Sequence, residues 1–199
     1  MTTTALLSTT YFGPIQWYQK LYRHDECRIE RMESFRKQTY RNRCVIATTN
    51  GPQVLTLPIE RGTRLMRDIK ISDHGNWRHL HWNALRSAYG ESPFFEFYAD
   101  DIRPFFERKW EYLFDFNWEI TRTMCQLLDI HPRLTATEDY QPQVDNDFRE
   151  TIRPKHSAED PDFTLQRYYQ VYEGKWGFLP NLSILDLLFN MGNEAIFYL

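Results

Sequence analysis

Near its start the chain carries the stretch Leu6-Leu7-Ser8-Thr9-Thr10-Tyr11-Phe12-Gly13-Pro14-Ile15, which decides how the fold begins. Residues 5–9 have the length and apolar content of a short buried strand. Gly13-Pro14 then places proline at the first turn of a predicted helix, in which apolar side chains recur at helical spacing at Ile15, Tyr18, Leu21 and Tyr22. The Ser/Thr-rich loop between strand and helix offers its backbone N–H groups either to a bound anion or to simple helix capping.

Further strands are predicted along the chain. Residues 27–31 alternate between apolar and polar side chains, as a half-buried strand does. Val45–Thr48 and Val54–Pro58 flank an Asn50-Gly51 pair, which is typical of a β-hairpin. Shorter strand patterns occur at residues 69–71, 133–137 and 167–172.

Helical periodicity dominates the middle and the end of the sequence. The predicted helices cover residues 76–89, a short segment from Pro93 to Tyr98, a long segment from Asp101 or Pro104 to Leu128, and a closing segment from Pro180 to Phe189 that Gly192 ends. Asn117 interrupts the apolar stripe of the long helix, and residues 138–163 form a long acidic loop. We therefore expect an α/β fold, a single domain over residues 1–199, with a mixed sheet, an N-terminal strand-loop-helix, a β-hairpin and a helical middle segment.

Composition narrows the class of protein. With 42% hydrophobic and 26% charged residues, the chain is typical of a soluble globular protein. No apolar stretch approaches the roughly 20 residues that span a bilayer, and residues 1–7 lack the pattern of a signal peptide. Cys27, Cys44 and Cys125 are not spaced as a metal or redox pair, so no disulfide framework is expected. We expect a cytoplasmic protein without a membrane span.

Charge is divided unevenly along the sequence. Residues 1–70 hold 12 of the 24 Lys and Arg but only 6 of the 27 Asp and Glu, whereas the whole chain has a net charge of −3. Nucleic-acid binding needs an extended basic face, which this acidic chain does not predict. The basic residues concentrate in Phe35-Arg36-Lys37-Gln38-Thr39-Tyr40-Arg41-Asn42-Arg43. This segment predicts a site for a small anion, and a solvated charge run is the competing interpretation.

Four other groups of residues in the sequence have side chains that could take part in catalysis or binding. His79 and His81 are two residues apart on a predicted helix and face different sides, so a general base is favoured over a metal site, with packing or capping as the alternative. Cys44 follows the basic segment and is either an activated thiol or a buried core residue. Asp100 and Asp101 suggest helix capping, or a divalent cation. Arg153-Pro154-Lys155-His156 forms a second basic cluster that could close over the same anion as the first, or stay an exposed loop.

Several motifs together resemble the WbqC-like protein family. The resemblance rests on residues 6–15, Lys37–Cys44, Asn76–Trp82, Tyr89–Phe95, Tyr98–Asp101 and Phe178–Asn190, and covers essentially the whole chain. It implies a role in O-antigen-type surface-polysaccharide biosynthesis. Longer relatives carry a strand-helix-strand unit before the Pro-Asn-Leu-Ser motif, where this chain has the acidic loop. They also have a His or a Gln-Pro where this chain has Ser8-Thr9-Thr10, which removes one candidate base.

Two functions follow as hypotheses. In the first, a transferase transfers a group to, or otherwise modifies, an activated (amino) sugar: Lys37, Arg41 and Arg43 hold its anionic donor or substrate, a nucleotide sugar or an acyl or aminoacyl donor. Gln38 and Asn42 then bind neutral groups, Tyr11 and Tyr40 stack on a ring, and His79 or His81 is the base. In the second, the chain is a non-catalytic anion- or glycan-binding assembly protein. The sequence identifies no cofactor and no metal ligand set, and it leaves a homo-oligomer open.

Overall fold

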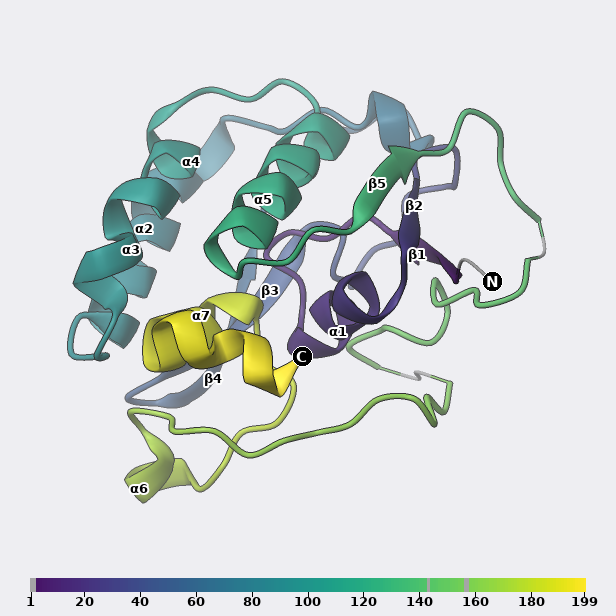
Figure 1. The fold of residues 1–199 in the computed structure, drawn as a ribbon. Helices are drawn as coiled ribbons and strands as arrows, with labels where there is room; N and C mark the ends of the chain where they lie inside the picture. Colours follow the sequence, from purple (N-terminus) through teal and green to yellow (C-terminus); the bar gives the residue numbers. More distant parts are fainter. Residues whose placement is uncertain (1–2, 143, 156–157) are drawn as a thin grey trace.

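A three-stranded parallel sheet forms the first part of the structure (Figure 1). The computed structural model describes residues 3–142, 144–155 and 158–199. Strand β1 (Thr4–Ser8) pairs with β2 (Glu26–Glu30), which pairs with β5 (Arg133–Ala136), with Thr4 beside Glu26 and Glu26 beside Arg133. Helix α1 (Ile15–Arg23) connects the first two strands. The predicted strand-loop-helix and the α/β class are confirmed.

The far edge of β1 is covered by the acidic loop. Leu6 N–H donates to the Asn146 carbonyl at 3.0 Å, and Phe148 N–H donates back to the Leu6 carbonyl at 2.9 Å. Residues 146–148 therefore run beside β1 in the parallel direction, although they are too short to form a strand. The chain beyond β5 thus returns to the opposite edge of the sheet, and β1 has neighbours on both sides.

The predicted hairpin is confirmed as a second, antiparallel sheet. Strands β3 (Arg43–Thr48) and β4 (Gly51–Thr56) pair in register from Arg43 with Thr56 to Thr48 with Gly51. Gly51 has a φ of 95°, which the tight turn requires and which glycine adopts without a steric penalty. The fold therefore contains parallel and antiparallel pairing in two separate sheets.

Helices and aromatic side chains fill the space around these sheets. The remaining helices are α2 (Trp77–Tyr89), α3 (Phe95–Ile102), α4 (Pro104–Glu107), α5 (Leu113–Leu127), α6 (Glu173–Trp176) and α7 (Ile184–Met191), with 3₁₀ turns at Met66–Asp68, His74–Asn76 and Gly192–Tyr198. Tyr11, Phe12 and Phe116 are fully buried between them. Within the described residues, no helix has the length and apolar content to cross a membrane.

Two predicted elements are wrong for one shared reason. The expected helix up to Leu128 is broken between α4 and α5, and residues 69–71 form isolated bridges instead of a strand. These two segments bond to each other: Ile71 N–H donates to the Glu111 carbonyl at 2.9 Å, and Leu113 N–H donates to the Ile69 carbonyl at 2.8 Å. A long-range pairing has therefore replaced one helical turn, which periodicity alone does not reveal.

The strand predicted at residues 167–172 is also wrong. Its alternation arises because Tyr168 and Gln170 point inward, where both donate to the buried Asp186 carboxylate at 2.6 and 3.1 Å. Tyr89 donates to the other oxygen of the same carboxylate at 2.8 Å. The alternation of side chains in this segment therefore reflects hydrogen bonds to Asp186 on α7, and the segment is not a strand of either sheet.

The Pro-Asn-Leu-Ser motif fastens the start of α1 to the hairpin. Ile15 N–H donates to the Leu182 carbonyl at 3.0 Å, and Ser183 N–H donates to the Val45 carbonyl at 2.8 Å. The Ser183 hydroxyl donates to the Phe12 carbonyl, and the Asn181 Oδ1 atom accepts from Gln16 N–H at 2.9 Å. The start of α1 is thus capped by residues 181–183, and within the described residues no side chain of the Ser/Thr-rich loop caps it.

We expect Asn181→Ala to lower the free energy of unfolding by about 1–2 kcal/mol, because the substitution removes the cap of α1. Asn181 also has a φ of 51°, a left-handed conformation that alanine adopts with strain. Urea denaturation measures the effect, and Asn181→Gly is the matched control that removes the cap without the strain. Equal stability of wild type and both variants would contradict this role of Asn181.

Candidate functional site

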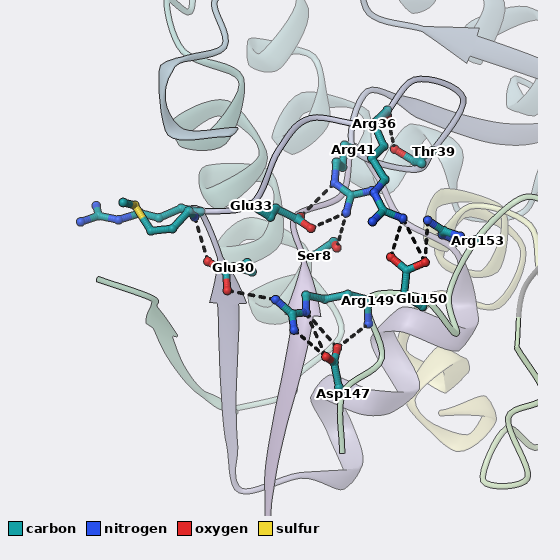
Figure 2. Close-up of polar contacts among 12 residues, drawn as sticks. Ser8, Glu30, Glu33, Arg36, Thr39, Arg41, Asp147, Arg149, Glu150 and Arg153 are labelled. Carbon is teal, nitrogen blue, oxygen red and sulfur yellow. Dashed lines mark hydrogen bonds and ion pairs between the residues drawn. The ribbon is translucent and has the colours of Figure 1, made fainter. Parts of the chain in front are cut away.

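A charged network lies at the carboxyl ends of β1 and β2 (Figure 2). Ligands of open α/β sheets usually bind at this end of the strands. The network contains four carboxylates and four guanidinium groups, and it is therefore neutral in sum at pH 7: Glu30, Glu33, Asp147 and Glu150 with Arg36, Arg41, Arg149 and Arg153. Its members divide into a buried part and an exposed part.

The first buried pair joins the basic segment to the sheet. Arg41 donates through Nε to Glu33 at 2.9 Å and through a terminal nitrogen to the second carboxylate oxygen at 2.5 Å. The same nitrogen donates to the Ser8 hydroxyl at 2.8 Å. The side chains of Arg41 and Glu33 are only 2% and 8% exposed. This bidentate contact with Glu33 occupies the guanidinium donors of Arg41 that the sequence predicted would bind a ligand.

The second buried cluster centres on Arg149. Its guanidinium donates to both oxygens of Asp147, to Glu30 at 3.2 Å and to the Gln141 carbonyl at 2.7 Å. Burial acts to raise the pKa of Asp147, but the hydrogen bonds from Arg149 outweigh it and leave that pKa below its ordinary value. Glu30 is fully buried and also accepts from the Thr137 hydroxyl. Arg149 therefore ties Gln141 and Asp147 to Glu30 at the end of the sheet.

The exposed part brings the two predicted basic clusters together. Arg36 lies 2.7 Å from one oxygen of Glu150, and Arg153 lies 2.7 Å from the other. The side chains of Arg36 and Glu150 are each 54% exposed. One carboxylate thus serves two cations, which leaves a local positive charge. His156, from the second basic cluster, lies outside the described residues.

A pocket of about 450 Å³ opens between these groups. It is lined by Met32, Glu33, Ser34, Arg36, Tyr140, Pro142, Asp147, Arg149 and Glu150. The Tyr140 ring, half exposed, lies over the Arg149 guanidinium at 5.1 Å. This cation–π contact holds one face of the ring while its exposed part borders the pocket. The pocket consequently offers an aromatic surface next to a mixed charged lining, in which Arg36 and Arg149 lie among three carboxylates.

The other residues predicted from the basic segment are placed differently. Lys37 and Gln38 are exposed in a turn, where Gln38 has a φ of 60°. Tyr40 is buried, and burial raises its pKa to about 12. Asn42 donates to the Leu57 carbonyl at 2.9 Å and is buried, and Arg43 is half-buried at the start of β3. None of these five residues is among those that line the pocket.

The two predicted histidines lie apart from the pocket lining as well. His81 is buried, and its Nδ1 atom is 2.9 Å from the hydroxyl of Tyr11, which is fully buried. Burial lowers the pKa of His81 to about 4, against a smaller opposing effect of a hydrogen bond with the Thr56 backbone. His79 is exposed and pairs with Asn83 at 2.7 Å. Their roles as bases stay predictions.

The remaining candidates take ordinary structural positions. Cys44 is buried, and burial raises the pKa of its thiol well above the usual value, which opposes an activated thiolate. Asp100 and Asp101 lie within α3 instead of before a helix, so their predicted capping role is wrong. Among the described residues, no group of three or more His, Cys, Asp or Glu side chains is arranged to hold a metal ion.

Two residues of the charged network, Glu30 and Glu33, could have been identified from the sequence. Glu30 ends an alternating strand, and Glu33 follows within one turn, so both fall at the edge where parallel strands place ligand-binding groups. Asp147 and Arg149 gave no comparable signal, because the pairing of residues 146–148 with β1 joins segments far apart in sequence.

Fold and pocket define a small α/β protein with a charged site at the carboxyl end of a parallel sheet. The model of the WbqC-like protein family matches residues 9–158, and the chain belongs to this family. It is 27% identical over 227 residues to "Uncharacterized protein Rv1507c" of Mycobacterium tuberculosis (strain ATCC 25618 / H37Rv), with 100% of this chain and 98% of that protein covered. No solved structure matches the chain.

We expect Glu33→Gln to lower the free energy of unfolding by about 3 kcal/mol, since it leaves the buried Arg41 charge without a counterion. Glu150→Gln, at the exposed end of the same network, should cost less than about 1 kcal/mol. Urea denaturation of both variants makes the comparison. Equal losses would show that burial does not separate the two parts.

The stability of the protein should fall in acid because of His81. Its folded pKa, about 4, lies below the unfolded value of 6.5, so the unfolded chain gains the proton first as the pH falls. The loss from this group between pH 7.5 and pH 5 is about 2 kcal/mol. We expect His81→Gln to show a smaller loss by urea denaturation at these two pH values. An unchanged pH dependence would place the titrating group elsewhere.

Proposed function

We propose that this protein binds the anionic group of an activated sugar at the Arg36–Arg153 rim and acts in the cytoplasmic assembly of a surface polysaccharide. Membership of the WbqC-like family supports the setting, because the family name comes from a protein of O-antigen biosynthesis. The ligand class is a small anion joined to a ring, such as a nucleotide sugar or an acyl or aminoacyl donor. We thus assign the anion contact to Arg36 and Arg153 in place of Lys37, Arg41 and Arg43.

The observation that carries the proposal is the sharing of Glu150 by two guanidinium groups. A phosphate has more acceptor oxygens and more negative charge than one carboxylate, so it would satisfy Arg36 and Arg153 better. Hydrogen bonds to charged groups contribute about 1.5–3 kcal/mol each. Because Glu150 is half exposed, turning it into solvent would cost little.

The pocket beside this rim suits the remainder of such a ligand. Its volume of about 450 Å³ falls in the range of small-molecule sites. Tyr140, Pro142 and Met32 supply apolar surface for one face of a ring, and Asp147 and Glu33 keep carboxylate oxygens near its polar edges. The aromatic contact predicted for Tyr11 and Tyr40 is thus proposed for Tyr140.

For the reaction itself we propose group transfer to the sugar, with His79 or His81 as the general base. A non-catalytic binding or assembly role is the second candidate, and one observation favours it: neither histidine is among the residues that line the pocket. An enzyme would consume the donor, whereas a binding protein would only be stabilised by it.

We expect UDP-sugars to raise the melting temperature of the wild type, and Arg36→Gln and Arg153→Gln to weaken apparent affinity at least tenfold. Thermal shift titrations with UDP-glucose, UDP-N-acetylglucosamine and inorganic pyrophosphate measure this. Arg103→Gln is the matched control, because Arg103 is 55% exposed and paired with an equally exposed glutamate, as Arg36 is.

Glu150→Gln is the informative second variant, since freeing both arginines should strengthen pyrophosphate binding. Binding that survives Arg36→Gln and Arg153→Gln unchanged, or that is lost equally in Arg103→Gln, would contradict the site. Chromatographic analysis of the nucleotide after incubation separates the two roles, because a transferase releases a product and a binding protein returns the donor intact.

A further inference from the structure

A second hollow, of about 310 Å³, lies between the hairpin turn and α2. It is lined by Thr48, Thr49, Asn50, Gln53, Leu80, Asn83, Ala84, Ser87 and Ala88. None of these lining residues is charged, although 26% of the chain is. It shares no lining residue with the charged pocket. The two hollows therefore differ in chemistry as well as in position.

The lining combines two kinds of group that suit a neutral saccharide. The amides of Asn50, Gln53 and Asn83 each carry both donors and acceptors, which is what a sugar hydroxyl needs from a partner. Leu80, 59% exposed, and Ala84 supply apolar surface against which the C–H face of a sugar ring can pack. An ionic ligand would find no counterion among the lining side chains.

The hairpin side of the groove is held in place by its own hydrogen bonds. The Thr48 hydroxyl donates to the Gly51 carbonyl at 2.8 Å and accepts from Asn50 N–H at 3.1 Å. Lys175 donates to the Thr49 carbonyl at 2.6 Å. In the described part of the chain, the side-chain amides of Asn50 and Gln53 bond to no other residue. They are thus available to a ligand on a fixed turn.

The adjoining hollow defines the polar end of the groove. It shares Asn83 and Ser87 with the uncharged hollow described above, and its lining adds Arg86, Gly90, Phe95 and Glu96. The two hollows run along the same side of α2, so a chain of more than one sugar unit has room to extend from the uncharged part towards Arg86 and Glu96.

The geometry points to this groove as a binding site for a neutral oligosaccharide, with Asn50, Gln53 and Asn83 as hydrogen-bonding residues and Leu80 as the ring contact. The site is independent of the proposed anion site, because neither its residues nor its ligand is shared. His79 lies beside this groove, because its ring nitrogen is 2.7 Å from the side chain of Asn83.

The test is saturation-transfer NMR and isothermal titration calorimetry with maltohexaose, cellohexaose and chitotetraose. We expect at least one of these neutral oligosaccharides to bind. The double variant Asn50→Asp/Gln53→Glu, which changes exposed side chains, should weaken binding at least tenfold, and Leu80→Ala should also weaken it. Gln126→Glu is the control, because Gln126 is exposed on α5 and its change should leave affinity within twofold.

The outcomes separate this site from the anion site. Pyrophosphate binding by the Asn50→Asp/Gln53→Glu variant should equal that of wild type, and oligosaccharide binding by Arg36→Gln should be unchanged. Failure of all three oligosaccharides to bind would overturn the proposal. So would binding that Asn50→Asp/Gln53→Glu and Leu80→Ala leave intact.

Discussion

The buried ion pair of Arg41 and Glu33 is the constraint on which the charged end of the sheet depends. It joins the end of β1, through the Ser8 hydroxyl, to the segment after β2 and to the entrance of β3. The Arg41 carbonyl also accepts from the Asn117 side chain at 2.8 Å, which ties the same residue to α5. Because breaking a buried pair leaves an uncompensated charge, the loop that carries Arg36 is held at both ends.

Burial divides the arginines of this site into two functional kinds. Arg41 and Arg149, both under 10% exposed, are bonded to buried carboxylates, and of the two only Arg149 is among the residues that line the pocket. Arg36 and Arg153 share a single exposed carboxylate, so solvent or a ligand can compete for them. Charge alone does not distinguish the two kinds. The difference arises from the positions of the carboxylates, with Glu33 and Asp147 beside the buried arginines and Glu150 beside the other two.

Local patterns in the sequence predicted the first strand, α1, the hairpin, α2 and the closing helix, because each has its own periodicity and turn residues. They failed where a segment satisfies its backbone at long range, as residues 69–71 and 108–112 do with each other. The basic segment was recognised as charged, but its division into buried Arg41 and exposed Arg36 depends on Glu33 and Glu150. The single polar residue on the α5 stripe, Asn117, proved to be a buried link to Arg41.

We propose that Glu150 occupies the place of a ligand anion between Arg36 and Arg153. A crystal structure of the protein grown with inorganic pyrophosphate tests it most directly. We expect electron density for the anion in contact with both guanidinium groups, with the Glu150 carboxylate turned away and the Arg41–Glu33 pair unchanged. An intact Glu150 bridge, with the anion bound elsewhere or absent, would contradict it.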